Sequence, residues 1–151
     1  MDESSAKETQ GWTLTQVGVV VKDVEKVVRR LCELGIGPFT PMKLPPERQE
    51  WFRGNPMQAE FNIMGARVGG VQLELIQPVE GDSPHREFLG LKGEGIQHVM
   101  FQVDDVDHEI ARLTAKGCTV LLEAHMPGGR RLAYIDLNAG GIIVELTQKR
   151  P

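Results

Sequence analysis

The stretch Gly95-Ile-Gln-His-Val-Met-Phe-Gln-Val-Asp-Asp-Val106 decides the fold of this chain. Its alternation of side chains predicts a strand that carries one inward histidine, His98, and leads straight into a helix. A weaker copy, Leu14-Thr-Gln-Val-Gly-Val-Val-Val-Lys-Asp-Val24, aligns with it so that Gln16 falls on His98. Because a repeated segment sets the architecture of a chain, the sequence predicts two copies of one structural module.

A second internal match joins the ends of the two modules. Val71-Gln-Leu-Glu-Leu-Ile-Gln77 aligns with Ile142-Ile-Val-Glu-Leu-Thr-Gln148, which places one glutamate on another. Each module therefore offers one polar side chain on its first strand and one on its last. If the modules pack face to face about a pseudo-twofold axis, we expect these four side chains to converge near it: Gln16, Glu74, His98 and Glu145.

Matching caps mark the helices of the two modules. Asp23 and Asp105 are suited to accept hydrogen bonds from the first amides of a helix, and Gly35 and Gly117 are suited to end it. Each module then reads strand, helix, strand, strand, strand. This order predicts an α+β fold of two tandem βαβββ modules that form an open, mixed sheet around a shared site. The expected division is a flexible tail over 1–13, a first module over 14–77, a connector with a short helix over 78–95 and a second module over 96–148.

Composition and charge limit the class of protein. The chain has 151 residues, 40% hydrophobic and 25% charged, as in one soluble globular domain. Its formal net charge of −4 gives no long-range attraction for nucleic acid or an anionic membrane. No apolar run approaches the roughly 20 residues that span a bilayer, and the polar start, Met1 to Gln10, is unlike a signal peptide. We expect a cytoplasmic protein with no nucleic-acid or membrane partner, in which Cys32 and Cys118 are free, mostly buried thiols.

The four converging side chains predict a metal site. Glu74 lies between Leu73 and Leu75, and a carboxylate among buried apolar residues is costly unless it is paired or binds a metal. A lone buried histidine is most often a hydrogen-bonded core residue, but His98 belongs to a set of repeat-equivalent positions. One imidazole, two carboxylates and one amide oxygen suit Zn, Co, Ni or Mn better than a thiolate-selective metal. We expect a single divalent ion in each chain.

The segment from Pro38 to Pro56 breaks the repeat pattern, since it contains five prolines and makes the first module longer than the second. A loop this long inside a compact domain is often functional, for example as a lid over an active site. Trp51 and Phe52 within it either line a substrate pocket or pack the loop onto the domain.

The segment His125-Met-Pro-Gly-Gly-Arg-Arg131 predicts a glycine-rich turn that carries two arginines. Arg130 and Arg131 either meet a phosphate or carboxylate of a substrate or form the charged tip of an ordinary hairpin. His85 and His108 fall on helix surfaces by their pattern, and we expect both to be solvated.

Three segments together resemble a known enzyme family. They are Asp82-Ser-Pro followed by Phe88-Leu89, the run from Lys92 to Val106, and the ending Gly141-Ile-Ile-Val-Glu-Leu-Thr-Gln148. In these segments the chain resembles the methylmalonyl-CoA epimerases of the vicinal oxygen chelate superfamily, and the match covers about 14–148. The resemblance implies two βαβββ modules around a divalent metal, with ligands that fall here on His98, Glu145 and Glu74.

The resemblance also implies a reaction. In these relatives a metal chelates two neighbouring substrate oxygens and stabilises an enolate as a proton leaves carbon, while a carboxylate takes and returns the proton. It places Glu60 at a family glutamate proposed as the catalytic base, with Glu145 as the second candidate. We therefore expect a metal-dependent isomerase that acts on a 2-substituted acyl thioester such as methylmalonyl-CoA, and that forms a homodimer.

Two departures keep other functions open. Gln16 stands where the epimerases generally carry histidine, and Asp136-Leu-Asn138 stands where they have a His-Pro-Lys segment. The set Gln, Glu, His and Glu is similar instead to the zinc set of animal-type glyoxalase I, and in that interpretation Glu145 is the base. The alternatives are a glyoxalase I-like lyase acting on a hemithioacetal, and a non-enzymatic protein of the same fold that binds a drug or metabolite.

Overall fold

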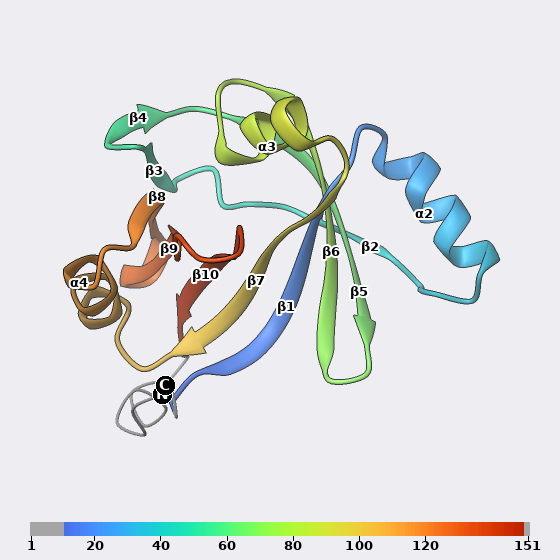
Figure 1. Cartoon of the computed structure of the whole chain (residues 1–151). Coiled ribbons are helices and arrows are strands. Elements are labelled where there is room, and N and C mark those ends of the chain that lie inside the picture. Colours follow the sequence, from blue (N-terminus) through green and yellow to red (C-terminus); the bar gives the residue numbers. More distant parts are fainter. Residues whose placement is uncertain (1–10, 150–151) are drawn as a thin grey trace.

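The computed structural model describes residues 11–149. Its helices are α2 (Val24–Glu33), α3 (Pro84–Lys92) and α4 (Val106–Ala115), with a 3-10 turn η1 (Pro127–Gly129) between two strands. The strands are β1 (Thr13–Val20), β2 (Thr40–Met42), β3 (Gln49–Phe52), β4 (Asn55–Met57), β5 (Glu60–Val68), β6 (Val71–Glu80), β7 (Gly95–Val103), β8 (Thr119–Met126), β9 (Arg130–Asp136) and β10 (Ile143–Gln148). Figure 1 shows a curled sheet with α2 and α4 at its two sides and α3 above its middle.

Within residues 11–149 the ten strands form one sheet, in the order β2-β5-β6-β1-β7-β10-β9-β8-β3-β4. Outward from the antiparallel β1–β7 pair, β1-β6-β5-β2 on one side corresponds to β7-β10-β9-β8 on the other. The β1–β6 and β7–β10 pairs are parallel, so the sheet is mixed. The predicted α+β fold of two βαβββ modules is confirmed. Of the expected tail, residues 1–10 lie outside the described residues, and β1 begins at Thr13.

Both module helices begin and end as the sequence predicts. The side chains of Asp23 and Asp105 each accept a hydrogen bond from an amide in the first turn of α2 and α4. Just beyond the two helices, Gly35 and Gly117 have φ angles of +82° and +91°. Glycine adopts this left-handed conformation without steric strain, which explains why each helix ends where it does.

The helices fix which face of the sheet each side chain occupies. Leu73 and Leu75 of β6 pack in the hydrophobic cluster beneath α2. Alternate residues of a strand point to opposite faces, so Glu74 between them is turned to the inner face of the curled sheet. The same holds in β10, whose apolar residues pack beneath α4 and leave Glu145 on the inner face.

The second half of the proline-rich segment is a hairpin rather than the expected loop. β3 pairs with β4, and β3 also pairs antiparallel with β8 at the far end of the second module. The insertion in the first module therefore extends the sheet of the second. Pro56 is compatible with this arrangement because β4 is the edge strand, where a missing amide donor is tolerated.

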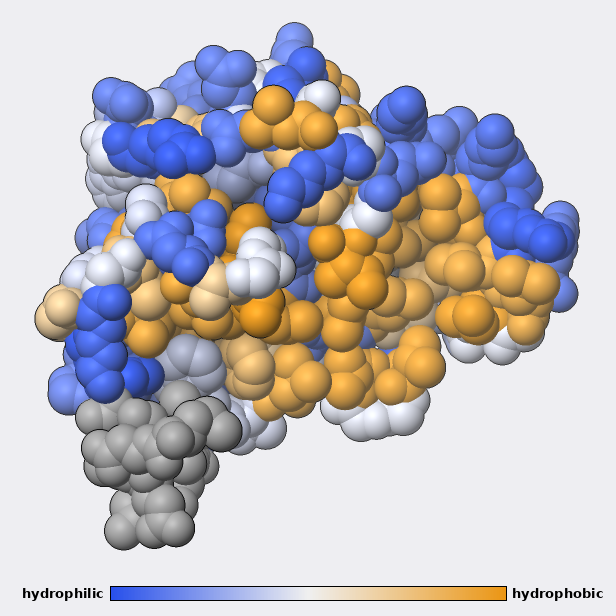
Figure 2. Space-filling view, in the orientation of Figure 1, coloured by the Kyte–Doolittle hydropathy of each residue, from blue (hydrophilic) through white to orange (hydrophobic). Residues whose placement is uncertain are grey.

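Hydrophobic side chains gather on one part of the surface. Figure 2 shows them over the region where β1, β5 and β6 lie in Figure 1, while the outer side of α2 is hydrophilic. Leu14 of β1 and Val68 of β5 are among the exposed large hydrophobic residues.

Neither thiol is paired, as expected. Cys32 is exposed and Cys118 is half-buried, so the expectation of mostly buried thiols was wrong for Cys32. Between residues 11 and 149, no helix has the length and apolar character needed to cross a membrane.

Candidate active site

Four polar side chains meet on the inner face of the sheet. They come from the four central strands, which lie side by side in the order β6-β1-β7-β10, and all four are buried: Glu74, Gln16, His98 and Glu145. The structure thus brings together the side chains that the internal repeat singles out.

Their contacts centre on one imidazole nitrogen. Nε2 of His98 lies 3.0 Å from Oε2 of Glu145, 3.1 Å from Oε1 of Gln16 and 3.7 Å from Oε1 of Glu74. The amide nitrogen of Gln16 also donates a hydrogen bond of 3.2 Å to Glu74. One nitrogen therefore faces three oxygen atoms from three different strands.

Gln97 orients the His98 ring. Nδ1 of His98 lies 3.0 Å from Oε1 of Gln97, which is an acceptor, so the Nδ1 proton is directed to this amide oxygen. Nε2 then faces the oxygens of Gln16 and Glu145, which are also acceptors. This arrangement favours a second proton on the ring or a cation shared with the surrounding oxygens.

Burial and mutual charge shift the pKa values of this cluster. Burial, and then the charge of Glu145, raise the pKa of Glu74 to about 7 against the opposing effects of His98 and Gln16. Burial lowers the pKa of His98, but the hydrogen bond and charge of Glu145 and the charge of Glu74 outweigh it, so that this pKa is raised. The cluster therefore favours added positive charge.

Tyr134 and His85 extend the cluster. The hydroxyl of Tyr134, on β9, is hydrogen-bonded to Glu145. Nε2 of His85, on α3, lies 3.0 Å from the same hydroxyl. His85 is only 5% exposed and packs edge-on against Phe61, so the expectation of a solvated histidine was wrong. His108 is exposed on α4, as expected.

The burial of this pair shifts both pKa values. Burial, and then the charge of His98, lower the pKa of His85 to about 3, so its imidazole is neutral. Burial, and then the charges of Glu145 and Glu74, raise the pKa of Tyr134 well above its ordinary value of 10. Tyr134 therefore keeps its proton and donates a hydrogen bond to Glu145, while a neutral His85 supports the hydroxyl from the other side.

A cavity of about 60 Å³ adjoins the cluster. Glu74, Glu145, His85 and Tyr134 form part of its wall, and the β3–β4 hairpin adds Glu50. Most of the remaining wall is apolar. Analysis of the sequence missed three of these residues, because Glu50, His85 and Tyr134 have no polar counterpart in the internal repeat.

Two outer clefts of about 580 Å³ share walls with this cavity. The first cleft contains Lys43 and has Phe61 in common with the cavity. The second cleft has Glu50 in common with the cavity. Glu60, the residue that the family resemblance places at the catalytic base, is exposed at the start of β5. It lines both outer clefts but does not contribute to the wall of the 60 Å³ cavity.

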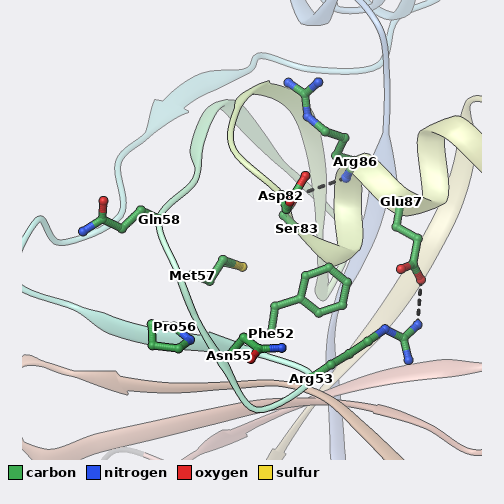
Figure 3. A pocket seen from close by; sticks show the side chains of 10 residues that line it. All are labelled: Phe52, Arg53, Asn55, Pro56, Met57, Gln58, Asp82, Ser83, Arg86 and Glu87. Carbon is green, nitrogen blue, oxygen red and sulfur yellow. Dashed lines mark hydrogen bonds and ion pairs between the residues drawn. The ribbon is translucent and has the colours of Figure 1, made fainter.

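A third cleft, of about 560 Å³, lies between the β3–β4 hairpin and the start of α3 (Figure 3). An ion pair of 2.8 Å between Arg53 and Glu87 joins its two sides. Phe52 lines this cleft and also packs against the apolar cluster around Met57. Its packing role is therefore seen, whereas contact with a substrate stays a prediction. None of the four clustered polar residues lines it.

Trp51, Arg130 and Arg131 are not part of the wall of the 60 Å³ cavity. The Trp51 ring packs against His125 at 5.0 Å between ring centres. Arg131 forms an ion pair of 3.0 Å with Asp107 of α4. Contact between a substrate and Trp51, Arg130 or Arg131 stays a prediction.

The sequence profile of the glyoxalase/bleomycin resistance protein/dioxygenase superfamily matches residues 15–134. The chain belongs to this superfamily. Among relatives, it is 29% identical over 141 residues to the mitochondrial methylmalonyl-CoA epimerase of Bos taurus, which covers 89% of this chain and 73% of the relative. It is 28% identical over 96 residues to the uncharacterized protein YqjC of Bacillus subtilis, covering 62% of this chain and 69% of that one.

Solved structures share the fold of this superfamily member. The hypothetical protein BH1468 from Bacillus halodurans superposes with a TM-score of 0.70 at 20% identity, over 94% of this chain and 97% of the other. Methylmalonyl-CoA epimerase from Mycobacterium tuberculosis gives 0.63 at 22% identity, over 91% and 88%. A Streptomyces coelicolor methylmalonyl-CoA epimerase variant in complex with 2-nitronate-propionyl-CoA gives 0.64 at 22% identity, over 91% and 97%.

Members of this superfamily commonly bind divalent metals, and the donors of this chain suit such an ion. The separations of 3.0 and 3.1 Å around Nε2 of His98 are close to the roughly 3.0 to 3.4 Å between neighbouring ligands on an ion with bonds of about 2.1 Å. As the side chains stand, no three His, Cys, Asp or Glu groups among the described residues are arranged to hold a metal ion. The donors are instead hydrogen-bonded to one another, and an ion would replace those bonds.

Proposed function

We propose that this chain is a metal-dependent isomerase that removes and returns a proton beside the carbonyl of a 2-substituted acyl thioester, with methylmalonyl-CoA as the first candidate. The observation that carries the proposal is the buried cluster of one imidazole, two carboxylates and one amide oxygen beside a cavity. The similarity to bovine methylmalonyl-CoA epimerase over most of the chain supports the substrate class.

In this proposal Gln16, Glu74, His98 and Glu145 hold one Co, Zn, Ni or Mn ion. When bound, such an ion polarises two neighbouring oxygens of the substrate and makes the adjacent C–H more acidic. Gln97 fixes the orientation of His98 through the contact at Nδ1.

Glu145 is the carboxylate that we assign to proton transfer, for which it would have to loosen from the ion. A base must come within hydrogen-bond reach of the proton that it moves, and Glu145 lines the 60 Å³ cavity whereas Glu60 lies in the outer clefts. The hydrogen bond from Tyr134 holds the Glu145 carboxylate in position. Because the contact with His85 fixes the Tyr134 hydroxyl in turn, both are positioning residues for Glu145.

The size of the spaces supports a division of the substrate. A cavity of about 60 Å³ admits only a small acyl group, far less than the roughly 300 Å³ or more of a site for a whole small molecule. The rest of a thioester then lies in the outer cleft that shares Phe61 with the cavity. Lys43 lines that cleft and supplies positive charge for the phosphates of a CoA group.

The test is hydrogen exchange at carbon. The chain is loaded with Co or Zn and incubated with methylmalonyl-CoA in deuterated water, and deuterium at C2 is followed by NMR. We expect uptake far above the uncatalysed background and interconversion of the two epimers, both lost in His98→Ala. Uptake at the background rate with methylmalonyl-CoA and related 2-substituted thioesters would overturn the proposal.

One observation favours a second function. Gln16 contributes an amide oxygen, and the set Gln, Glu, His and Glu is similar to that of animal-type glyoxalase I. A glyoxalase I-like lyase would form a thioester from methylglyoxal and glutathione, and this assay separates it from the isomerase. Tight binding of a drug or metabolite without turnover in either assay would instead favour a binding protein.

We also infer a homodimer. The exposed hydrophobic surface over β1, β5 and β6 (Figure 2) supports this, because apolar patches of this kind are commonly covered by a second copy. Sedimentation equilibrium tests it directly, with Leu14→Glu expected to shift the protein towards the monomer. A monomer at high concentration for the unaltered chain would contradict the inference.

A further inference from the structure

Glu50 is a buried carboxylate in the cavity wall that the proposed reaction has not used so far. It lies on β3, and its side chain is 7% exposed. In the sheet, β3 and the β10 strand of Glu145 are separated by β8 and β9. Neighbouring strands lie about 4.8 Å apart, so three such spacings separate the strand of Glu50 from the strand of Glu145. Because the sheet is curled, the two carboxylates enter the same cavity from different walls.

Arg48 holds Glu50 in place. Its Nη1 donates to the carbonyl of Pro45 at 3.1 Å and its Nη2 donates to the carbonyl of Ala59 at 3.0 Å. With both ends of the guanidinium anchored to backbone, Nε lies 3.0 Å from Oε1 of Glu50. Burial raises the pKa of Glu50 and the charge of Arg48 opposes that shift. The result is a fixed, buried carboxylate of the kind that general bases require.

Glu50 also connects the cavity with solvent. It lines both the 60 Å³ cavity and the outer cleft of about 580 Å³ that contains Glu60 and Glu80. A proton on Glu50 can therefore be exchanged with water in the outer cleft without passing the metal-ligand cluster.

We propose that Glu50 is the second acid–base residue of this site and faces the side of the substrate carbon opposite Glu145. The proposal rests on the epimerase function proposed above. An epimerase must take a proton from one face of a carbon and return one to the other face. Two carboxylates on different walls of one cavity meet this requirement, whereas Glu145 alone serves only one face.

The exchange balances with these two groups. For one epimer the Glu50 carboxylate takes the C2 proton, so that the C–H bond breaks, an O–H bond forms on Glu50 and the electron pair enters the thioester as an enolate. A proton from Glu145 then forms the new C–H bond on the opposite face. For the other epimer the two residues exchange roles. After the product leaves, Glu50 loses its proton to water in the outer cleft and Glu145 regains a proton from water that enters the cavity, which restores the starting state.

The test compares Glu50→Gln with the unaltered chain, starting from each epimer of methylmalonyl-CoA in deuterated water. We expect interconversion of the epimers to fall at least about 100-fold. The epimer whose C2 proton faces Glu145 should keep its deuterium exchange, and the other epimer should lose it. The matched control is Glu80→Gln, an exposed carboxylate of the same outer cleft, which should leave both rates unchanged.

Metal content and unfolding midpoint are measured for each variant, so that loss of the fold is recognised. If Glu50→Gln does not fold, Glu50→Asp replaces it and should show the same one-sided loss to a smaller degree. Interconversion within about twofold of the unaltered rate, equal loss of exchange from both epimers, or a one-sided loss in Glu60→Gln instead would overturn the assignment of Glu50. An unaltered chain without any exchange is a separate result, since it defeats the epimerase function itself and the role of Glu50 with it.

Discussion

Gly18 of β1 lies directly opposite His98 of β7, and the imidazole occupies the space in which a Cβ at position 18 would stand. Atoms of the ring would be closer to such a Cβ than non-bonded atoms approach one another. The backbone of Gly18 is not in the left-handed region, so the ring, and not a turn, is the reason for glycine here. Because Gly18 of the first module has no side chain, the His98 ring of the second module fits against the β1 backbone.

Gly18→Ala should therefore displace His98 from its oxygens. We expect the free energy of unfolding to fall by about 1–3 kcal/mol, as for other overpacked interiors, and the metal affinity to fall with it. Chemical denaturation and metal titration measure the two effects. Gly70→Ala is the matched control, because a Cβ there meets open space in the turn between β5 and β6. Unchanged metal affinity in Gly18→Ala would show that His98 is not held by this contact.

Metal binding is the next prediction. We expect the chain, purified without chelators, to carry about one divalent ion, and His98→Ala to carry none, because Nε2 of His98 lies at the centre of the donor set. Removal of the ion with a chelator should lower the unfolding midpoint. An ion present at one hundred times its Kd adds about 2.7 kcal/mol of stability. Elemental analysis that finds equal metal in both proteins would contradict the proposed site.

Much of the fold could be predicted because the chain repeats itself. The alignment of Gln16 with His98 and of Glu74 with Glu145 requires the same strand order in both halves, and the caps Asp23 and Asp105 fix the helix starts. Strand alternation then determines which side chains face inward. These rules are local or follow from symmetry, so one sequence is enough to apply them.

The rest depends on contacts that have no counterpart in the repeat. The β3–β4 hairpin leaves its own module and pairs with β8, so the position of Glu50 in the cavity follows from a long-range pairing. His85 looks like a surface residue by helical pattern, but α3 lies against the inner face and turns it towards Tyr134. Glu60 shows the converse, since the family resemblance placed it at the reaction and the structure places it in the outer clefts.

Tyr134 offers a spectroscopic test of the site, because it is the only tyrosine in the chain. Burial, and then the charges of Glu145 and Glu74, raise its pKa well above 10. We expect no phenolate absorbance from the native protein as the pH rises through 10, and a normal titration once the chain is unfolded in urea. Glu145→Gln removes one of the charges and should bring the native titration to lower pH. A native tyrosine that titrates near its ordinary value would place Tyr134 outside the cluster.

The pH dependence of stability tests the burial of His85. Its pKa is lowered to about 3 by burial and then by the charge of His98, while the unfolded chain binds a proton near pH 6.5. Below about pH 6.5 the unfolded state therefore holds a proton that the folded state does not, and the contribution of His85 to stability falls by about 1.4 kcal/mol per pH unit. The raised pKa of Glu74 has the opposite effect on stability, because between about pH 7 and pH 4.5 the folded state holds a proton on Glu74 that the unfolded state does not. A single curve of stability against pH therefore mixes both effects.

A comparison of variants separates them. His85→Gln keeps an amide donor for the Tyr134 hydroxyl but cannot titrate. Between about pH 7 and pH 4.5 we expect the difference in unfolding free energy to move in favour of this variant by about 2–3 kcal/mol, measured by urea denaturation at each pH. His108→Gln, at an exposed position on α4, is the matched control and should show no such shift. A difference that stays constant across this pH range would mean that His85 binds a proton in the folded state as readily as in the unfolded one, and that the α3 contact with Tyr134 opens in solution.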